Sequence, residues 1–445
     1  MARRIDLLNG KITQSLLALA LPIMATSMIQ LAYNLIDMIW VGRIGVNAIS
    51  AIGASGMYIW IGEGLILMYK IGAQVLVAQQ LGAGNISRAR DYVKTVLQTS
   101  FLSSVTYALA LFVFASSMIG FFDFQSADVI FQAVTYLKIV AWGMVFMSFN
   151  FVMTGLLTAT GDSKTPFLVN TVGIVINIFL DPLLIFGFDM GVSGAGLATV
   201  LSQGIVSLLL LVTMSRDDYL FHDLHFVGKV DLRGFMGIAR IGLPTSLQSV
   251  GYAAISMILS RYTASFGDSA VAITRVGGGI ESISWMTADG FGSALSSFIA
   301  QNYGSKKYDR ARHGYFQALK ITTIWGLGTT MLLVLFPGQL LSVFIHEPGL
   351  YPLGIAYLQI LGLSQLFMCY ELMSSGAFGG YGDTRTPFLV SIILTGARIP
   401  LAFLLVALVH NVTGIWWAIS LSSLAKGVIL VTLFFIRTKK YQYQT

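Results

Sequence analysis

The chain has 445 residues, of which 56% are hydrophobic and 11% are charged, and its formal net charge is +7 at pH 7. Soluble domains usually contain about 25% charged residues, so this composition excludes an ordinary soluble domain. Apolar runs long enough to cross the roughly 30 Å hydrocarbon core of a bilayer recur along the chain. The composition therefore predicts a polytopic membrane protein. Its basic excess is typical of cytoplasmic loops and does not indicate a nucleic-acid partner.

Twelve membrane-spanning helices are predicted in chain order, which makes the expected fold class all-α. The first span follows Arg3, Arg4 and Lys11. It is too long for a signal-peptide core and no cleavage pattern precedes a mature start, so we expect it to remain uncleaved. The predicted spans are 15–40, 50–80, 93–116, 129–157, 166–188, 194–214, 241–265, 271–301, 314–336, 351–378, 387–409 and 414–436.

Lysine and arginine residues lie in alternate connections between these spans. The two chain ends and the connections after even-numbered spans hold most of them, whereas the other connections hold Arg43 and several acids, including Asp123 and Asp189. Basic loops usually remain in the cytoplasm. Both termini and the basic connections are therefore expected to be cytoplasmic, which an even number of spans allows.

The two halves of the chain repeat one another. "GDSKTPFLVN" at 161–170 is matched by "GDTRTPFLVS" at 382–391, and Pro22 is matched by Pro244 at nearly the same offset. An offset that changes only slightly in loops indicates a duplicated domain, and six spans per copy insert both copies in the same direction. We therefore predict parallel repeats related by a pseudo-two-fold axis along the membrane normal. The expected lobes are 1–214 and 237–445, joined by a cytoplasmic linker over 215–236.

The repeated motif itself is expected to be structural. Gly-Asp suits a tight turn, and Thr165 or Thr386 could cap the helix that follows. Pro166 and Pro387 suit a first helical turn, where the missing N–H has no partner in any case. The motif thus indicates a duplicated architecture and does not mark the site of function.

Several segments resemble the MATE family, the multidrug and toxic compound extrusion transporters, and among its branches the prokaryotic DinF-like group. They are "LALPIMATSMIQLAYNLIDMIWVG", "QQLGAGN" after the second span, "GDSKTPF" after the fourth and "NIFLDP" in the fifth. The resemblance implies two six-helix lobes around a central cleft and export of amphipathic organic cations driven by entry of H⁺ or Na⁺. It also implies a monomer in the lipid of a prokaryotic cytoplasmic membrane.

Other kinds of chemistry have little support in the sequence. No P-loop motif occurs, and no Ser-His-Asp or Cys-His set shares a depth in the membrane, so neither an enzyme nor a cofactor is expected. The alternative that stays open is a flippase for lipids or lipid-linked oligosaccharides from the same superfamily, which would line its cleft with cations. The cations within the predicted spans are instead scattered: Lys70, Lys138, Arg261, Arg275, Lys320, Arg398 and Lys426.

The coupling-cation site is expected in the N-terminal half. Acids within membrane spans are costly and usually functional or paired, and here they are Asp37, Glu63, Asp181, Glu281, Asp289 and Glu371. At about 1.5 Å of rise per residue, Asp37, Asp181 and Thr199 all fall in the outer half of the first lobe. Asn177 and Tyr33 each lie one helical turn from an acid. These five residues are predicted to bind H⁺ or Na⁺, with Na⁺ possible at Asp37, Asn177, Asp181 and Thr199.

The second half offers a control for this prediction. The positions equivalent by the repeat offset are Leu259 for Asp37, Ile419 for Thr199, and an apolar residue near 399–402 for Asp181. The seventh span offers Gln248 and no carboxylate, and the tenth offers only Glu371. The coupling cation is therefore expected in the first lobe alone.

Substrate contacts are predicted from polar and Met side chains that could form an adaptable surface. Glu281 and Asp289 on the eighth span could in addition attract a cationic substrate. The predicted cleft residues are Gln30, Asn34, Asn150, Met153, Thr154, Glu281 and Asp289.

Overall fold

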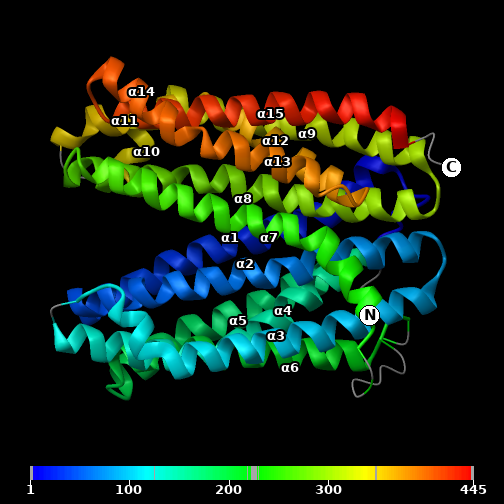
Figure 1. The fold of residues 1–445 in the computed structure, drawn as a ribbon, viewed down its shortest axis with the longest axis horizontal. Coiled ribbons are helices and arrows are strands. Elements are labelled where there is room, and N and C mark those ends of the chain that lie inside the picture. The colour runs from blue at the N-terminus through cyan, green and yellow to red at the C-terminus, as the bar shows by residue number, and fades with distance from the viewer. Residues whose placement is uncertain are drawn as a thin grey trace. The chain divides into compact units, whose positions relative to one another are not determined.

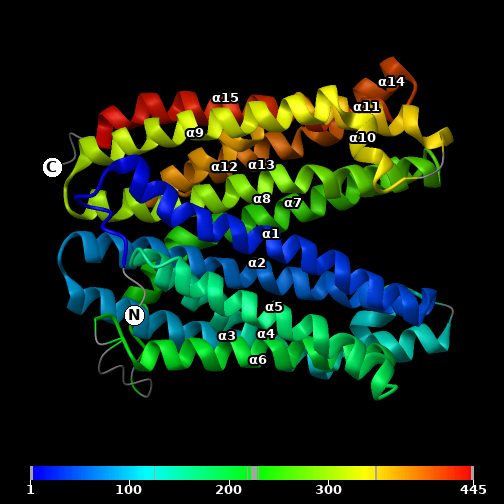
Figure 2. The same ribbon diagram turned by 180° about the vertical axis from the view of Figure 1, so that it is seen from behind.

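The computed structural model describes residues 4–124, 126–217, 219–221, 228, 230–345 and 348–441. Within these residues every regular element is a helix and no strand is present, which confirms the all-α fold class. Long helices lie side by side along most of their lengths (Figures 1 and 2).

Each predicted span is occupied by helix. The first half forms α1 (Ile12–Ile44), α2 (Val46–Gly82), α3 (Ile86–Gly120), α4 (Ala127–Ala159), α5 (Lys164–Pro182), the π-helical turn η1 (Leu183–Gly187) and α6 (Gly191–Ser215). The second half begins with α7 (Leu232–Ala264), α8 (Asp268–Gly304), α9 (Tyr308–Leu335), α10 (Pro337–Ser342) and the 3₁₀ turn η2 (Pro348–Leu350). It ends with α11 (Tyr351–Gly362), α12 (Gln365–Gly380), α13 (Arg385–Gly396), α14 (Arg398–Val409) and α15 (Thr413–Tyr441).

Three spans of the second half are broken where the first half has a continuous α-helix or a π-helical turn. Pro337 begins α10, where a proline lacks no helical hydrogen bond. Pro400 cannot donate to the carbonyl of Gly396, and the eleventh span is accordingly divided into α13 and α14. The tenth span is divided into α11 and α12, which are bent by 43°.

Length and apolar composition agree with a membrane protein. In the described part of the chain, nine helices are long and apolar enough to cross a membrane, and the bent pair of α11 and α12 would make a tenth. Helices α7 and α8 are not among these nine.

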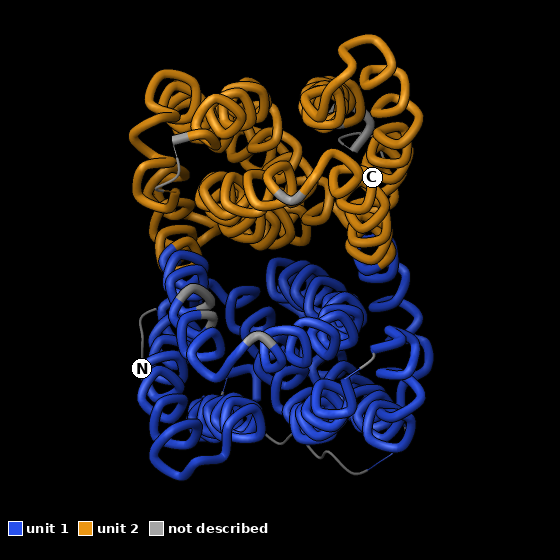
Figure 3. The backbone as a smooth tube through the Cα atoms, turned by 90° about the vertical axis from the view of Figure 1, so that its left-hand side faces the viewer, with its two compact units in different colours: residues 1–5, 25–246 blue, residues 6–24, 247–445 orange. Residues whose placement is uncertain are grey.

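The chain forms two compact units, which Figure 3 shows in two colours. Unit 1 consists of Met1–Ile5 and Ala25–Ser246, and unit 2 consists of Asp6–Met24 and Leu247–Thr445. Helices α1 and α7 thus each pass from one unit to the other. The passage begins at Ala25 in α1 and at its repeat equivalent Leu247 in α7, in both cases shortly after the helix proline. The compact units therefore exchange short segments. The division into lobes at 1–214 and 237–445 stays a prediction.

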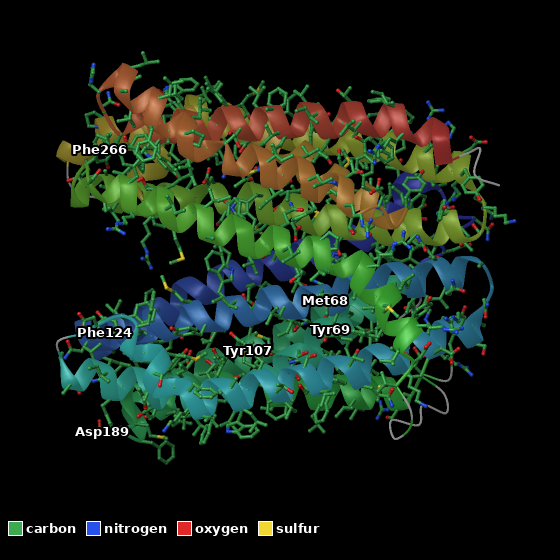
Figure 4. All side chains as sticks on the ribbon, in the orientation of Figure 1. Met68, Tyr69, Tyr107, Phe124, Asp189 and Phe266 are labelled. Carbon is green, nitrogen blue, oxygen red and sulfur yellow. The ribbon has the colours of Figure 1, made fainter. Side chains whose placement is uncertain are left out.

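Glycines allow the exchanged segments to pack closely. In unit 1, a Cβ on Gly242 of α7 would overlap the main chain of Met68 in α2, the residue that Figure 4 labels. In unit 2, the glycine is on the resident helix: a Cβ on Gly290 of α8 would lie 3.3 Å from the backbone nitrogen of Met24 in α1. Gly290 is the repeat equivalent of Met68. Each crossing therefore has a glycine, which lies on the exchanged helix α7 in unit 1 and on the resident helix α8 in unit 2.

The two units repeat their internal packing. In unit 1, α4 contacts α2, α3 and α6, and α5 contacts α6; in unit 2, α12 contacts α8, α9 and α15, and α13 and α14 contact α15. A glycine lies at the same crossing in both. A Cβ on Gly155 of α4 would lie 3.0 Å from the carbonyl oxygen of Lys70, and a Cβ on Gly376 of α12 would overlap the carbonyl of Gly292. The duplication predicted from the sequence is therefore confirmed by the fold.

The repeated GD-x-x-TP motif is a helix cap, but the capping residue was predicted wrongly. The side chain of Asp162, not that of Thr165, accepts the hydrogen bond from a backbone N–H, at 3.0 Å from Thr165 N. Asp383 does the same for Thr386 N at 3.2 Å, and each threonine hydroxyl donates to the same carboxylate. A carboxylate is favoured here because it also interacts with the positive end of the helix dipole.

Candidate functional site in unit 1

An acidic side chain lies where α5 ends. Asp181 is in the last turn of α5, and Pro182 and the π-helical turn η1 follow it directly. Proline cannot donate to the preceding turn, so the α-helical ladder stops here, and π-helical turns of this kind are frequent at functional sites. The side chain of Asp181 is completely buried.

Asp37 of α1 lies next to Asp181. The two carboxyl groups are within hydrogen-bonding reach of one another. Among the described residues, neither forms an ion pair with Lys, Arg or His. The helical-rise argument placed these acids at one depth, and the structure brings them into contact.

The other three predicted residues surround this pair. The amide nitrogen of Asn177 donates to Asp181 Oδ1 at 3.5 Å. The hydroxyls of Tyr33 and Thr199 are within hydrogen-bonding reach of one another, and Tyr33 lies close to both acids. Asp181 Oδ2 and Asn177 Oδ1 are buried and have no hydrogen-bond partner in the described part of the chain. The cluster is therefore rich in acceptor oxygens that lack donors.

One member of the cluster was missed in the sequence. Tyr136 of α4 is buried and lies close to both Asp37 and Asp181. Tyrosine is common in apolar helices, so its residue type carries no signal. Its place in the fourth predicted span would have pointed to the cluster only if the rotation of α4 about its axis had been known, because that rotation determines which way Tyr136 faces.

This arrangement suits a small exchangeable cation. Two neighbouring carboxylates in a medium of low dielectric constant cannot both stay charged without a proton or a cation between them. Carboxylate, amide and hydroxyl oxygens are the ligands that hard cations prefer. Among the described residues, no group of three or more His, Cys, Asp or Glu side chains could hold a metal ion.

Most of the predicted substrate residues in α4 are buried within unit 1. Asn150 donates to Gln203 Oε1 at 2.8 Å and accepts from the Ser207 hydroxyl at 2.8 Å, both on α6. Met153 is completely buried, and the Thr154 hydroxyl donates to the carbonyl of Asn150. Asn150 therefore joins α4 to α6.

The remaining predicted substrate residues are in α1 and α8. Gln30 is half-buried, and the side chain of Asn34 is outside the described residues. Asp289 is exposed. Glu281 is not free for a substrate in this structure, because its carboxylate accepts hydrogen bonds from Tyr357 and Gln365 in unit 2. Their role in substrate binding stays a prediction.

The equivalent positions in unit 2 carry no acid. Leu259 and Ala402 belong to the apolar core of unit 2, and Ile419 packs against it. Unit 2 does, however, contain a buried ion pair that was not predicted, between Lys426 and Glu371. Both residues had been noted as charges within spans, but their pairing depends on α12 and α15 being neighbours.

Comparison with known proteins gives the same architecture. The sequence profile of the MatE family matches residues 22–183 and 244–404, which are corresponding parts of the two repeats. The chain belongs to the MatE family. This MatE protein is 26% identical over 402 residues to the probable multidrug resistance protein NorM of Thermotoga maritima. The aligned region covers 89% of this chain and 86% of that relative.

Two further matches extend over nearly the whole chain. The FAD transporter of Shewanella oneidensis is 23% identical over 442 residues, or 96% of this MatE chain and 95% of that protein. A crystal structure of MATE in complex with MaL6 aligns with a TM-score of 0.94 and 23% identity, over 99% of this chain and 100% of the other. The twelve-helix fold and the resemblance to MATE transporters are thereby confirmed. The protein is a multi-pass membrane transporter, and no enzyme family is indicated.

Proposed function

We propose that this MatE protein is a multidrug efflux antiporter, which exports amphipathic organic cations in exchange for H⁺ or Na⁺. The names of its multidrug-resistance relatives support the efflux part of the proposal. The acidic cluster of unit 1 supports the exchange part. We assign the coupling cation to Asp37 and Asp181, with Asn177, Thr199 and Tyr33 as neighbouring ligands.

The assignment rests mainly on the lack of hydrogen-bond donors and basic partners for the acids of the cluster among the described residues. Asp181 is fully buried, its Oδ2 atom has no donor among the described residues, and the carboxyl beside it belongs to a second acid. A buried polar atom without a partner is expensive, and a buried charge much more so. A site of this composition is stabilised by binding a proton or a sodium ion and can release it when the surroundings change.

Helix α1 offers a way to connect cation binding to transport. Asp37 lies in the part of α1 that packs in unit 1, whereas Pro22 lies in the part that packs in unit 2. The two residues are about 22 Å apart along the helix at a rise of about 1.5 Å per residue. Neutralising the acidic pair would draw α1 toward α5, and the proline would allow the two parts of α1 to bend. This motion would change the cavity of the first lobe and release the drug outward.

The orientation in the membrane is part of the same proposal. Connections after α1, α3 and α5 are at one end of unit 1, where Figure 4 labels Phe124 and Asp189, and those after α2 and α4 are at the other. We place the second end, with both termini, in the cytoplasm because it carries the basic residues. A cysteine at Asp123 should then react with a membrane-impermeant reagent from outside, and one at Lys164 should not. The reverse pattern would contradict the orientation, and the native Cys369 is buried.

Transport by the purified protein in liposomes tests the function. A pH gradient and a Na⁺ gradient are imposed separately, and movement of a cationic dye is followed for the wild type, Asp181→Asn and Asp189→Asn. We expect one gradient to drive dye export, Asp181→Asn to abolish it, and Asp189→Asn to leave it unchanged because Asp189 is exposed at the end of the helices. Parallel assays with a labelled lipid-linked sugar and with FAD test the alternative substrates. Movement of either of these without movement of dye would contradict drug efflux.

A further inference from the structure

Unit 2 contains a buried set of charged side chains that the proposed transport site does not use. Two are acids, Glu281 of α8 and Glu371 of α12, and two are bases, Arg398 of α14 and Lys426 of α15. Glu371, Arg398 and Lys426 are each no more than 4% exposed. The formal charges of the set cancel, in contrast to the uncompensated acids of unit 1.

Lys426 neutralises Glu371 directly. Its ammonium nitrogen lies 2.8 Å from Glu371 Oε2, and the hydroxyl of Ser391 donates to Glu371 Oε1 at 3.0 Å. Both carboxylate oxygens of Glu371 are therefore satisfied by side chains of the protein. A free cation would have to displace Lys426 to bind there.

Arg398 provides the second positive charge. Its guanidinium donates to Ser422 Oγ at 2.9 Å and to Ser423 Oγ at 3.0 Å, and it lies over the ring of Tyr252. Its charge also acts on Glu281, whose oxygens accept from Tyr357 at 3.3 Å and from Gln365 at 3.1 Å. The serines and the tyrosine ring hold the guanidinium in place without neutralising it.

The repeat relates this set to the acidic cluster of unit 1. Arg398 is the repeat equivalent of Asn177, and Tyr357 is the repeat equivalent of Tyr136, at the offset that relates the two GD-x-x-TP motifs. Of these two equivalents, Arg398 is a member of the set, and Tyr357 donates a hydrogen bond to its member Glu281. Where unit 1 has a neutral amide beside acids, unit 2 has a guanidinium.

The buried ion pair also has its equivalents in unit 1. Glu371 corresponds to Asn150 at the same offset. Lys426 corresponds to Val206 at the slightly shorter offset that relates α15 to α6. Neither equivalent is charged, so both the acid and the base of the pair are particular to unit 2.

We propose that Lys426 is a tethered counter-ion that occupies a latent monovalent-cation site in unit 2 and thereby keeps it closed to H⁺ and Na⁺. Removing Lys426 opens the site, with the carboxylate of Glu371 and the hydroxyl of Ser391 as its ligands. The proposal extends the proposed function, because it explains why coupling is restricted to unit 1. It can nevertheless be tested when the unit 1 site has been removed.

The physical reason is the cost of an uncompensated buried charge. Without Lys426, the Glu371 carboxylate must bind a cation or a proton, or be destabilising, because a buried ion that loses its partner is strongly unfavourable. The groups that face this region from the surrounding helices are Tyr252 on α7, Glu281 on α8, Tyr357 on α11, Glu371 on α12, Arg398 on α14 and Lys426 on α15. Of these, Glu371 supplies the anionic ligand once Lys426 is removed, whereas Glu281 accepts hydrogen bonds from Tyr357 and Gln365.

The test uses the full-length protein carrying Asp37→Asn, so that the unit 1 site does not contribute. Lys426→Val introduces the residue that unit 1 has at the equivalent position. Thermal unfolding is measured in NaCl and in choline chloride of equal ionic strength, each at acidic and alkaline pH. We expect the Asp37→Asn parent to respond weakly, and the variant that also carries Lys426→Val to gain several degrees in Na⁺ or at acidic pH. Lys138→Val, which removes a lysine of unit 1 that lies over Phe112, is the matched control.

Two results would overturn the proposal. The first is a Lys426→Val protein that folds and responds to Na⁺ and H⁺ no more than Lys138→Val does. The second is a Lys426→Val protein that cannot be recovered in any of the four buffers while Glu371→Gln with Lys426→Met folds normally, because the carboxylate then accepts no external cation. A wrong assignment of the coupling cation to unit 1 would give a different result. Asp37→Asn would then leave the stabilisation of the wild type by Na⁺ or acidic pH unchanged.

Discussion

The two units of this transporter have the same helices and different charges. Unit 1 carries Asp37 and Asp181 side by side without a basic partner among the described residues, whereas unit 2 carries Glu371 paired with Lys426 at 2.8 Å. The caps, the helix crossings and the helix prolines are common to both. Duplication therefore supplied the scaffold twice, and substitutions within it left buried acids without a basic partner in the copy to which we assign the coupling cation.

The interface between the fourth and sixth helices of each unit shows the same divergence on a smaller scale. In unit 1, Asn150 of α4 is held by Gln203 and Ser207 of α6, which are neutral. In unit 2, its equivalent Glu371 is held by Lys426. Both interfaces satisfy their buried polar atoms, but the charged one depends on keeping both partners.

The largest effect is expected at the helix crossings. Gly242→Val should prevent folding or cost at least about 3 kcal/mol, because its side chain would overlap the main chain of Met68, which cannot move aside. Gly290→Val should cost less, since its nearest neighbours are 3.3 Å from the new Cβ. Chemical unfolding in detergent measures both. Gly53→Val, with no atom within 4 Å, is the control, and equal losses in all three variants would show that the crossings are not close-packed.

The second-largest effect is expected when a buried polar residue loses its partner, and it should be greater for the charged Glu371 than for the neutral partners of Asn150. Lys426→Met should destabilise unit 2 by about 3–5 kcal/mol in choline chloride at alkaline pH, because it leaves a buried carboxylate alone. Asn150→Leu, the neutral counterpart in unit 1, should cost about 1–3 kcal/mol, since it leaves only neutral groups unpaired. Glu371→Gln combined with Lys426→Met should recover most of the loss. A double variant as unstable as Lys426→Met alone would mean that the pair acts through packing and not through charge.

A smaller effect is expected from the hydroxyl groups of the acidic cluster. Thr199→Ala and Tyr33→Phe should each weaken the apparent affinity for the coupling cation by about 2–10-fold, which corresponds to the loss of one hydrogen bond or ligand. The concentration of Na⁺ or H⁺ that gives half-maximal dye export is the quantity to measure. Thr213→Ala removes a hydroxyl from the same helix, where it donates only to the carbonyl of Leu209, and should change nothing.

The smallest effect concerns the repeated caps. Asp162→Ala and Asp383→Ala should each cost about 1 kcal/mol, because each removes the acceptor for one backbone N–H of the following helix. Asp383→Ala should cost slightly more, since Asp383 also pairs with Arg437 at 3.0 Å near the surface. Thermal unfolding of the two single variants decides this. Thr165→Val should be milder than Asp162→Ala, and the opposite order would restore the threonine as the capping residue.

The sequence predicted the acidic cluster because that prediction needed little information. The start of each span and a constant helical rise placed Asp37, Asp181 and Thr199 at one depth. The ion pair of Lys426 with Glu371 could not be predicted in this way, because many charged residues share a depth and only the packing of α12 on α15 selects the partners. Tyr136 was missed because the direction in which it faces depends on the rotation of α4.

The fold shows a similar division. Hydropathy and the repeat predicted all twelve spans, but not that α1 and α7 each pass from one compact unit to the other. Close packing at the two crossings involves Gly242 and Gly290, where a Cβ would meet a helix far away in the sequence. A single glycine in a chain with 46 of them gives no such indication.

Counting the cations bound by the purified protein tests the central claim most directly. Calorimetric titration with Na⁺, and proton release followed with a pH indicator, are carried out on the wild type, Asp37→Asn and Glu281→Gln. We predict one exchangeable monovalent cation per chain, lost in Asp37→Asn and retained in Glu281→Gln. Binding that persists in Asp37→Asn, or a second cation that disappears in Glu281→Gln, would contradict the assignment of coupling to unit 1.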